Sequence, residues 1–396
     1  MAHKQTLVLF ICTVTPMTLG AGFLPLLPVY ATQLGADQVK AGSFLAVVYL
    51  ALTAGSMAAG WMAALFRSRK IPLILAGVCC VPAAWLMGRV DSVWALTLLT
   101  AFVWFCGGLG LGLVQILAGL SARPEVRGRV FGLLATGNGL GTLIGGLASG
   151  YIADRAGFNA MFGVFAAYMA LWPVAAWFVT DFPVSEVGRS GRHALSGPAL
   201  GRDYILYAIS ALLVMVAISS FSLMRSLLMA ERAFTALAIS ATAAVSSIIR
   251  LPLPLVMGWL SDRSGRKRYM IVGRLATVVS LVTVLYAVRV WHFYLAAAFL
   301  AISSVTVLAV GRALITDLVP RQALDGGLAL ASALGAVGSV MGYAGTGLAL
   351  QRLGPAGATW IAAGLSAVSL FLLLPIRVRV TMTPMAEVPG LATDVS

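Results

Sequence analysis

Arg250 lies in the middle of a long apolar run, where packing alone does not explain a charged side chain. Its guanidinium stays charged at cellular pH and can donate two parallel hydrogen bonds to a carboxylate or phosphate. An unpaired charge at the centre of a membrane helix costs at least about 2.5–3.5 kcal/mol. Two interpretations follow: Arg250 hydrogen-bonds to carbonyl groups at a helix break beside Pro252, or it faces a cavity and binds an anionic group.

No acidic or histidine side chain accompanies Arg250 inside an apolar run. The 13 Asp and Glu residues and the three His residues all fall in loops, tails or the ends of apolar runs. Proton-driven carriers generally use a carboxylate or histidine within the membrane, where burial raises a carboxyl pKa toward neutrality. A membrane enzyme would need a cluster of such groups. We therefore expect no catalytic site, metal site or other cofactor.

The elements that must position Arg250 are membrane helices. Hydrophobic residues make up 60% of the chain and charged residues only 10%, and the apolar runs are about as long as a helix needs to cross a bilayer. These runs predict an all-α membrane protein, because lipid leaves no partners for unpaired backbone groups. The twelve predicted spans are 6–31, 41–65, 72–88, 93–120, 129–151, 159–180, 204–227, 235–260, 270–288, 293–316, 327–349 and 357–376.

The basic residues predict the orientation of these spans. Of the 27 Lys and Arg residues, 19 fall on the side of the N-terminus and seven on the other side, with Arg250 inside a span. This division puts Arg225 among the seven and Arg274 among the 19. An excess of basic residues marks the cytoplasmic side, so we expect both termini in the cytoplasm. The net charge of +14 then reflects topology and does not indicate nucleic-acid binding.

The sequence also indicates that a unit of six spans has been duplicated. A polar stretch at 181–203 has the composition of a linker and separates residues 1–180 from residues 204–376, which leaves 377–396 as a tail. Gly60 and Trp61 recur as Gly258 and Trp259 at an offset of 198 residues. Four glycines recur at an offset of 197: Gly141, Gly145, Gly150 and Gly157 match Gly338, Gly342, Gly347 and Gly354. Such repeats enclose a central site in many transporters.

Three motifs point to a known family. The loop after the eighth span reads Gly258-Trp-Leu-Ser-Asp262-Arg263-Ser-Gly265-Arg266-Lys267-Arg268. It closely resembles the conserved cytoplasmic loop of the major facilitator superfamily. The fifth span, from Gly137 to Gly146, resembles the glycine-rich motif of the family's antiporters, with Thr142 in place of the usual proline. The end of the first span, from Pro28 to Gly35, is similar to that of family exporters.

The sequence departs from the family pattern at two places. The first-half copy of the loop has Ala64 where the Asp is expected. The arginine that family drug antiporters carry in the fourth span is missing, since residues 104–112 are apolar or glycine. Proton–drug antiport of the usual kind is therefore in doubt.

The resemblance implies a latch that closes the cytoplasmic side. Asp262 would cap the eleventh span, which begins near Asp325, and would pair with Arg312 of the tenth span. The basic residues of the same loop, Arg263 and Arg266 on either side of Gly265, either join this latch or anchor the loop in the cytoplasm. In the fifth span Gly141 and Gly145 would let helix backbones pack closely, and the seam could slide during gating.

These observations predict a major-facilitator carrier of two six-helix bundles that moves a small organic solute, amphipathic or anionic, by alternating access. The predicted cavity lining is Phe23, Tyr49, Asn138, Phe221, Arg250 and Tyr343. Each aromatic could instead pack or face lipid. The alternatives are a proton-coupled multidrug exporter and a non-transporting receptor or assembly factor with the same fold. We expect a monomer in a bacterial plasma membrane, with the solute and the lipid bilayer as its partners.

Overall fold

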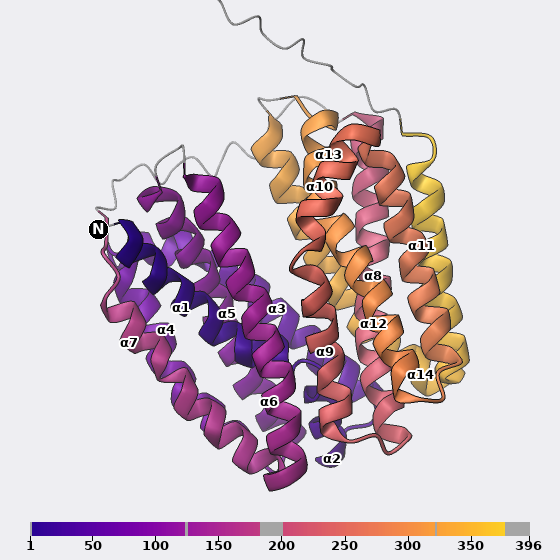
Figure 1. Ribbon diagram of the computed structural model, residues 1–396. Helices are drawn as coiled ribbons and strands as arrows, with labels where there is room; N and C mark the ends of the chain where they lie inside the picture. The colour runs from indigo at the N-terminus through magenta and orange to yellow at the C-terminus, as the bar shows by residue number, and fades with distance from the viewer. Residues whose placement is uncertain (1, 123–125, 183–200, 321–322, 377–396) are drawn as a thin grey trace, which may run out of the picture.

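The fold is known from a computed structural model that describes residues 2–122, 126–182, 201–320 and 323–376. Two helical bundles lie side by side (Figure 1), the first formed by α1–α7 and the second by α8–α14. Most of the predicted linker and all of the predicted tail, 377–396, lie outside the described residues.

The first bundle contains six membrane-spanning helices. α1 and α2 form span 1 around a break, and α6 supplies span 5 and, together with α7, span 6. The bounds are α1 Ala2–Phe23, α2 Leu27–Gln33, α3 Gln38–Leu65, α4 Lys70–Met87, α5 Val93–Ser121, α6 Arg127–Met169 and α7 Leu171–Trp177.

The second bundle repeats this plan. α9 and α10 form the bent span 8, α12, η2 and α13 form span 10, and α14 supplies spans 11 and 12. The bounds are α8 Arg202–Glu231, α9 Ala236–Arg250, α10 Leu253–Ser264, α11 Arg266–Leu285, α12 Val290–Val305, η2 Thr306–Val310, α13 Gly311–Leu318 and α14 Leu324–Leu373. With α6 divided at Gly157, α14 divided at Gly354, and α9 and α10 taken as one bent span, the described residues contain the predicted twelve spans.

The predicted repeat is visible in the backbone. Gly157 and Gly354, which match at an offset of 197 residues, both take positive φ angles, +79° and +67°, and turn one span into the next within α6 and α14. Only glycine adopts this conformation at little cost. The same backbone break therefore ends spans 5 and 11.

The repeated glycines also pack in the same way. A Cβ atom on Gly141 would lie 2.6 Å from the carbonyl oxygen of Val14 in α1, and one on Gly338 would lie 2.6 Å from that of Leu212 in α8. One turn later, Gly145 and Gly342 meet the backbone of the same two helices. The close packing predicted for these glycines is confirmed, as expected for small residues at helix contacts in lipid.

Two spans are interrupted at proline residues. Span 1 is interrupted over residues 24–26, at Pro25, and span 8 bends by 44° between Arg250 and Leu253, at Pro252. Proline lacks the amide donor that a continuous helix needs at these points. Pro16, in contrast, lies inside α1 without ending it. Arg250 thus sits at the C-terminal end of α9, directly before a break.

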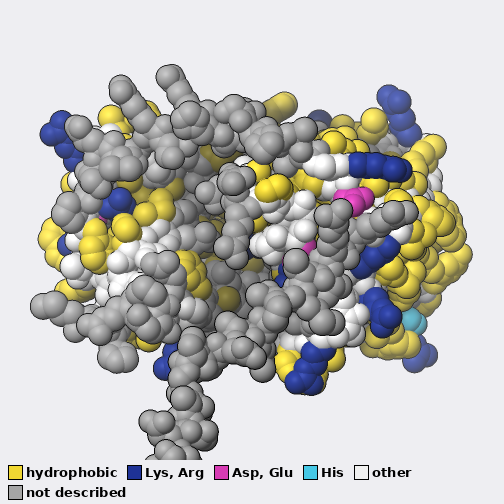
Figure 2. Space-filling view, turned by 90° about the horizontal axis from the view of Figure 1, so that it is seen from above, with side chains coloured by type: hydrophobic (Ala, Val, Ile, Leu, Met, Phe, Trp, Pro, Cys, Tyr) yellow, Lys and Arg dark blue, Asp and Glu magenta, His cyan; other side chains and the backbone are white. Residues whose placement is uncertain are grey.

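The bundles meet at the end of the molecule opposite the termini. There Gly146 and Gly150 of α6 pack on the start of α9, and Gly347 of α14 packs on Gln38 and Gly42 of α3. Toward the end that carries the termini the bundles diverge (Figure 1). Seen from that end, Lys and Arg side chains gather on the second bundle, and hydrophobic side chains cover its flank (Figure 2).

Candidate substrate site and gates

Two arginines from adjacent spans form the charged centre of the molecule. Arg225 of α8 is only 5% exposed, and its guanidinium lies 5.5 Å from the ring of Phe221. It is close enough to Arg250 for the two charges to interact. Arg250 donates one hydrogen bond, from Nη2 to the Ser304 hydroxyl of α12, at 3.0 Å. In the described part of the chain neither guanidinium has a carboxylate partner.

A pair of tyrosines brings the two bundles together beside these arginines. The rings of Tyr49, from α3, and Tyr343, from α14, lie 4.8 Å apart, and their hydroxyl groups are in polar contact. Tyr49 lies in the field of both Arg225 and Arg250, and the Tyr343 hydroxyl also contacts Ser222. Three of the predicted lining residues, Tyr49, Arg250 and Tyr343, are therefore neighbours.

The division of basic residues between the two sides was wrong for two arginines. Arg225 does not lie beyond the membrane, because α8 continues to Glu231 and keeps this residue inside the bundle. Arg274 is 0% exposed within α11, where its Nη2 lies 3.3 Å from the Ser210 hydroxyl and its Nε and Nη1 have no described partner. Both lie near the ends of their predicted spans, 204–227 and 270–288, so the division of charges counted each with the nearer side of the membrane.

Two cavities meet at Tyr49. One, of about 190 Å³, lies in the first bundle and is lined almost wholly by apolar groups, including Trp104 and Trp172. The other, of about 270 Å³, extends into the second bundle and is lined by Tyr207, Arg312 and apolar residues. A solute at this junction would find an apolar surface on one side and the cation of Arg312 on the other, which is the pattern of a small-molecule site. Arg225 and Arg250 act on Tyr49 but line neither cavity.

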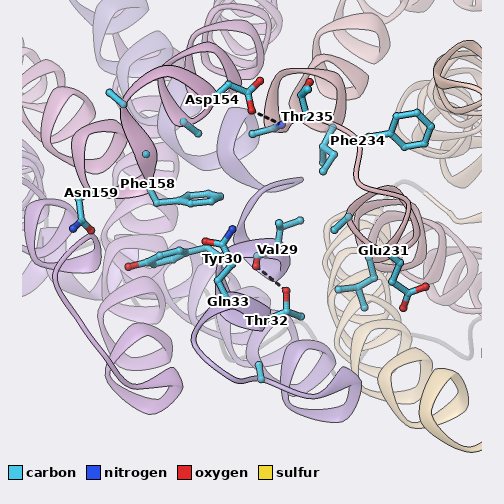
Figure 3. Close-up of a pocket in the computed structure, with 18 of the residues that line it drawn as sticks. Val29, Tyr30, Thr32, Gln33, Asp154, Phe158, Asn159, Glu231, Phe234 and Thr235 are labelled. Carbon is cyan, nitrogen blue, oxygen red and sulfur yellow. Dashed lines mark hydrogen bonds between the residues drawn. The ribbon is translucent and has the colours of Figure 1, made fainter.

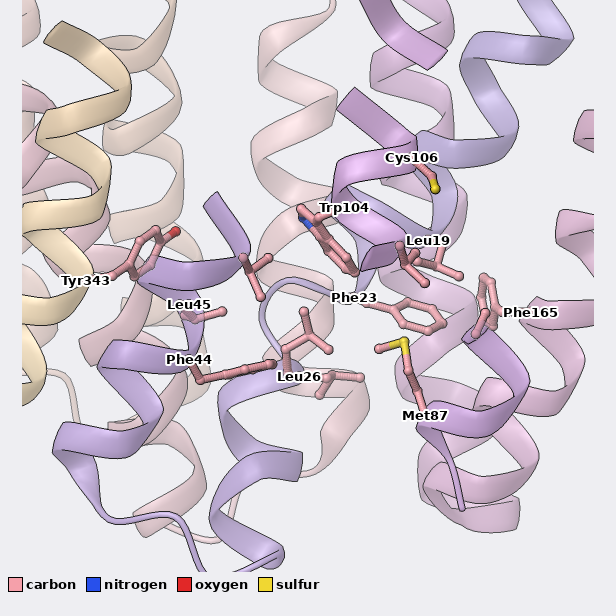
Figure 4. Packing of buried hydrophobic residues seen from close by; sticks show 14 of the residues in the cluster. Leu19, Phe23, Leu26, Phe44, Leu45, Met87, Trp104, Cys106, Phe165 and Tyr343 are labelled. Carbon is pink, nitrogen blue, oxygen red and sulfur yellow. The ribbon is translucent and has the colours of Figure 1, made fainter. Parts of the chain in front are cut away.

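The remaining predicted lining residues lie in different surroundings. Phe23 is 0% exposed in the core of the first bundle, where its ring centroid lies 4.4 Å from that of Phe165 (Figure 4). It packs this bundle and does not border the cavities at Tyr49. Phe221 is buried beneath the Arg225 guanidinium. Asn138 of α6 is exposed, beside Gly139, which approaches Leu251 at the break in span 8.

At the end opposite the termini, an acidic residue of the first bundle contacts the second bundle. The sequence predicted this residue only to lie in a loop or at the end of an apolar run. Asp154 of α6 accepts hydrogen bonds from the backbone amides of Ala236, at 2.7 Å, and Leu237, at 2.9 Å (Figure 3). These amides form the free N-terminus of α9, which carries partial positive charge. A carboxylate of the first bundle therefore caps a helix of the second and joins the two bundles at this end.

A vestibule of about 980 Å³ lies at this cap, and Asp154 is part of its lining. Its lining includes Tyr30, Phe158 and Asn159 from the first bundle and Glu231 and Phe234 from the second (Figure 3). The vestibule lies on the far side of the Asp154 contact from the termini. The vestibule therefore belongs to the contact made by Asp154, and not to the site formed by Arg225 and Arg250.

The predicted latch at the opposite end is described only in part. The side chains of Asp262 and Asp325 lie outside the described residues, so the pairing of Asp262 with Arg312 remains a prediction. Arg266 forms an ion pair with Asp317 of α13, at 2.8 Å. Gly265 takes a φ of +94° and turns α10 into α11, a conformation that favours glycine.

The other residues of this loop pack locally. The Arg263 guanidinium lies 3.9 Å from the ring of Trp259 on the same helix. Arg312 is exposed and lines the cavity that leads to Tyr49. In this arrangement Arg312 faces the region through which a solute would pass.

A second carboxylate cap closes the first bundle at the end that carries the termini. Asp181 accepts hydrogen bonds from the Ser68 hydroxyl, at 2.5 Å, and from the backbone amides of Arg69 and Lys70, at the start of α4. Partial burial raises the pKa of Asp181, but the hydrogen bonds outweigh it and leave this pKa below its ordinary value. Asp181 thus fastens the end of span 6 to the start of span 3.

Comparison with known proteins identifies the family. The family model described as Major Facilitator Superfamily matches residues 9–224 and 204–389. The chain belongs to the major facilitator superfamily. This superfamily is one of transporters, and the twelve spans and the close glycine packing described above accord with that membership. Among the described residues, no group of three His, Cys, Asp or Glu side chains is arranged to hold a metal ion.

Curated relatives of this superfamily member include multidrug resistance proteins. The chain is 26% identical over 298 residues to Multidrug resistance protein MdtG of Salmonella choleraesuis, which covers 70% of this chain and 72% of the relative. It is also 26% identical over 292 residues to the MdtG protein of Dickeya zeae, covering 69% and 70% of the two chains.

Solved structures share the fold. The structure of the nucleoside transporter NupG, as a D323A mutant, superposes with a TM-score of 0.81 at 15% identity and covers 94% of this chain and 99% of that chain. A peptide transporter POT in complex with alafosfalin gives a TM-score of 0.75 at 14% identity, with 94% and 93% covered. At such low identity these likenesses establish the fold alone.

Proposed function

We propose that this superfamily member carries an amphipathic organic anion by alternating access. The acidic group of the solute would bind between Arg225 and Arg250, and its apolar part would enter the cavity lined by Trp104 and Trp172. The observation that carries the proposal is the pair of guanidiniums, neither of which has a carboxylate partner in the described part of the chain. An arriving anion would offset the electrostatic cost of the buried Arg225, and it could reach Arg250, which is exposed.

The geometry around the arginines supports an anion with a flat or forked acidic group. Arg250 uses Nη2 on Ser304, at 3.0 Å, and keeps its other donors available. The Arg225 guanidinium lies 5.5 Å from the ring of Phe221, a contact that uses none of its donors. Carboxylate and phosphate groups match such a planar set of donors. The Tyr49 and Tyr343 hydroxyls lie close enough to add neutral hydrogen bonds.

Binding can be tested without knowing the natural solute. Purified protein would be screened by thermal shift against arylalkyl carboxylates, each paired with its uncharged amide. We expect carboxylates to stabilise the wild type and amides to have little effect. Arg250→Ala should abolish this stabilisation, while Arg250→Lys should restore only part of it, because lysine keeps the charge but loses the planar fork.

The matched control is Arg155→Ala, because Arg155 is an exposed arginine that lies over the ring of Tyr151, away from both cavities. This variant should respond to carboxylates like the wild type. If carboxylates stabilised the wild type, Arg250→Ala and Arg250→Lys equally, Arg250 would have a purely structural role.

A proton-coupled multidrug exporter is the second candidate, and the names of the curated relatives favour it. Adding a cationic drug to weakly buffered purified protein would then release protons. A non-transporting receptor would instead bind solute but show no flux in proteoliposomes. The anion proposal predicts flux of carboxylates without stoichiometric proton release.

We further propose that the end of the molecule that carries the termini faces the cytoplasm of a bacterial cell. The asymmetry of the basic residues supports this orientation. In a cysteine-free background, Ser92→Cys should react with an impermeant maleimide added to whole cells, whereas Arg202→Cys should not. The reverse pattern would overturn the orientation.

A further inference from the structure

A lateral groove of about 570 Å³ runs along the second bundle between α8 and the two arms of α14. Its walls include exposed apolar side chains, among them Met341, Leu348 and Ile361. Exposed apolar residues on membrane spans face lipid, and hydrophobic side chains also cover the flank of this bundle in Figure 2. The groove therefore opens toward the hydrocarbon of the bilayer and not toward the arginine site.

The internal repeat explains why the groove exists. At the matching place in the first bundle, Phe165 packs against Phe23 at 4.4 Å, and the Tyr168 hydroxyl lies 3.4 Å from that of Thr18. An offset of 197 residues replaces Phe165 by Ala362 and Tyr168 by Leu365, and both replacements line the groove. Aromatic rings fill this space in one bundle, and smaller side chains leave it open in the other.

One cation stands at the mouth of the groove. Arg352 lies two residues before the Gly354 turn, at the end of the molecule opposite the termini, and its side chain is exposed. It is the charged residue among the described lining, and its guanidinium has no described hydrogen bond or ion pair. Deeper in the groove the Thr346 hydroxyl donates a hydrogen bond to the Ser220 hydroxyl, at 2.6 Å. The groove thus combines an apolar channel with a free cation at the membrane surface.

We propose that this groove binds an anionic phospholipid of the leaflet opposite the termini, with an acyl chain in the channel and the headgroup phosphate on Arg352. Guanidinium groups bind phosphate through paired hydrogen bonds. A long basic side chain near a helix end extends to the headgroup level, where it attracts anionic lipid. The site is separate from the proposed solute site, so it does not depend on what the protein transports.

Native mass spectrometry of delipidated protein tests the proposal, with phosphatidylglycerol and phosphatidylcholine of identical acyl chains as the probes. The wild type should bind one phosphatidylglycerol more tightly than any phosphatidylcholine. Arg352→Ala should weaken that binding roughly five-fold, the effect of one basic residue near an anionic surface. It should also remove the preference between the two lipids.

The repeat supplies a matched control, because Arg155 is the counterpart of Arg352 at an offset of 197 residues. Arg155→Ala should leave the preferred lipid bound as in the wild type. Ala362→Phe restores the aromatic residue of the first bundle, and it should exclude both lipids from the site while melting and elution stay normal. A folded Arg352→Ala protein with unchanged preference, or an equal loss in Arg155→Ala, would overturn the proposal. So would unchanged lipid binding by Ala362→Phe.

Discussion

Where the second bundle carries Arg225, the first carries Leu27, and Arg250 is matched in the same way by Leu52, both at an offset of 198 residues. The surrounding backbones nevertheless correspond, down to the glycine contacts and the turns at Gly157 and Gly354. The duplication has therefore kept the packing contacts and the turns, while these arginines occur only at the second-half positions of the matched pairs. Leu52 lines an apolar cavity, whereas Arg250 donates a hydrogen bond to Ser304 and lies in the neighbourhood of Tyr49.

This asymmetry gives each bundle a separate task in the proposed binding site. The first offers aromatic and aliphatic surface to the body of a solute, and the second offers cations to its acidic group. Arg274 strengthens the contrast, because it adds a fully buried positive charge to the second bundle, whereas its counterpart in the first is Ala76. The positive charge of the proposed site therefore comes from the second bundle, and its apolar surface comes from the first.

Exchanging the paired residues should have the largest effect. Arg250→Leu removes a poorly compensated charge, so the ligand-free protein should melt at a higher temperature while anion binding is lost. Leu52→Arg places a charge in an apolar cavity and should destabilise the protein by about 2.5–3.5 kcal/mol. Thermal melts with and without carboxylate measure both changes. Equal destabilisation by the two exchanges would mean that the halves are equivalent in charge tolerance.

The glycine seams should behave alike in both halves. Gly145→Ala drives a methyl group into the carbonyl of Thr18, and Gly342→Ala places one 2.6 Å from that of Val216. Each should cost about 1–3 kcal/mol through overpacking. Gly364→Ala, where a methyl group meets nothing within 4 Å, is the control and should be neutral or stabilising. A cost in only one half would show that the seams have diverged.

The two gates should respond in opposite directions. Asp154→Ala removes the cap on α9 and should weaken the closed outer end by about 0.5–2 kcal/mol. Labelling of Ser332→Cys, which lines the inner cavity, should then increase from the outer side. Asp262→Asn, at the predicted inner latch, should decrease this labelling from the outer side. Asp91→Ala, in an exposed loop, is the control. If Asp154→Ala and Asp262→Asn shift labelling in the same direction, at least one of them is not a gate residue.

The smallest effect concerns the inner end of each bundle. Asp181 fastens the first bundle there, whereas Lys267 donates hydrogen bonds to the carbonyls of Leu374 and Ile376 in the second. Because the folded-state pKa of Asp181 lies below its unfolded value, its contribution is present above that unfolded value and is lost as pH falls through the folded one. Asp181→Asn should therefore melt earlier than wild type at neutral pH, and the difference should vanish in acid. A constant difference would contradict this account.

The sequence predicted the repeat, the twelve spans and a break beside Pro252, because hydrophobic runs, glycine spacing and proline are local signals. It also grouped Tyr49, Arg250 and Tyr343, which the structure brings together.

Arg225 and Arg274 were missed, because a charge near a span end is indistinguishable from a loop residue until the helix length is known. Asp154 was missed for a different reason: its partner is a helix end 82 residues away in the chain. The pairing of Asp262 with Arg312, which the family motif implies, stays a prediction.

The central claim is that the second bundle supplies the charge that selects an anionic solute. The most direct measurement is flux in proteoliposomes of an arylalkyl carboxylate that binds the purified protein, compared with its amide. Wild type and Arg225→Leu/Arg250→Leu would be reconstituted at equal density. The account predicts carboxylate flux in the wild type alone and negligible amide flux in both. Equal flux of carboxylate and amide, or undiminished carboxylate flux in the double variant, would contradict it.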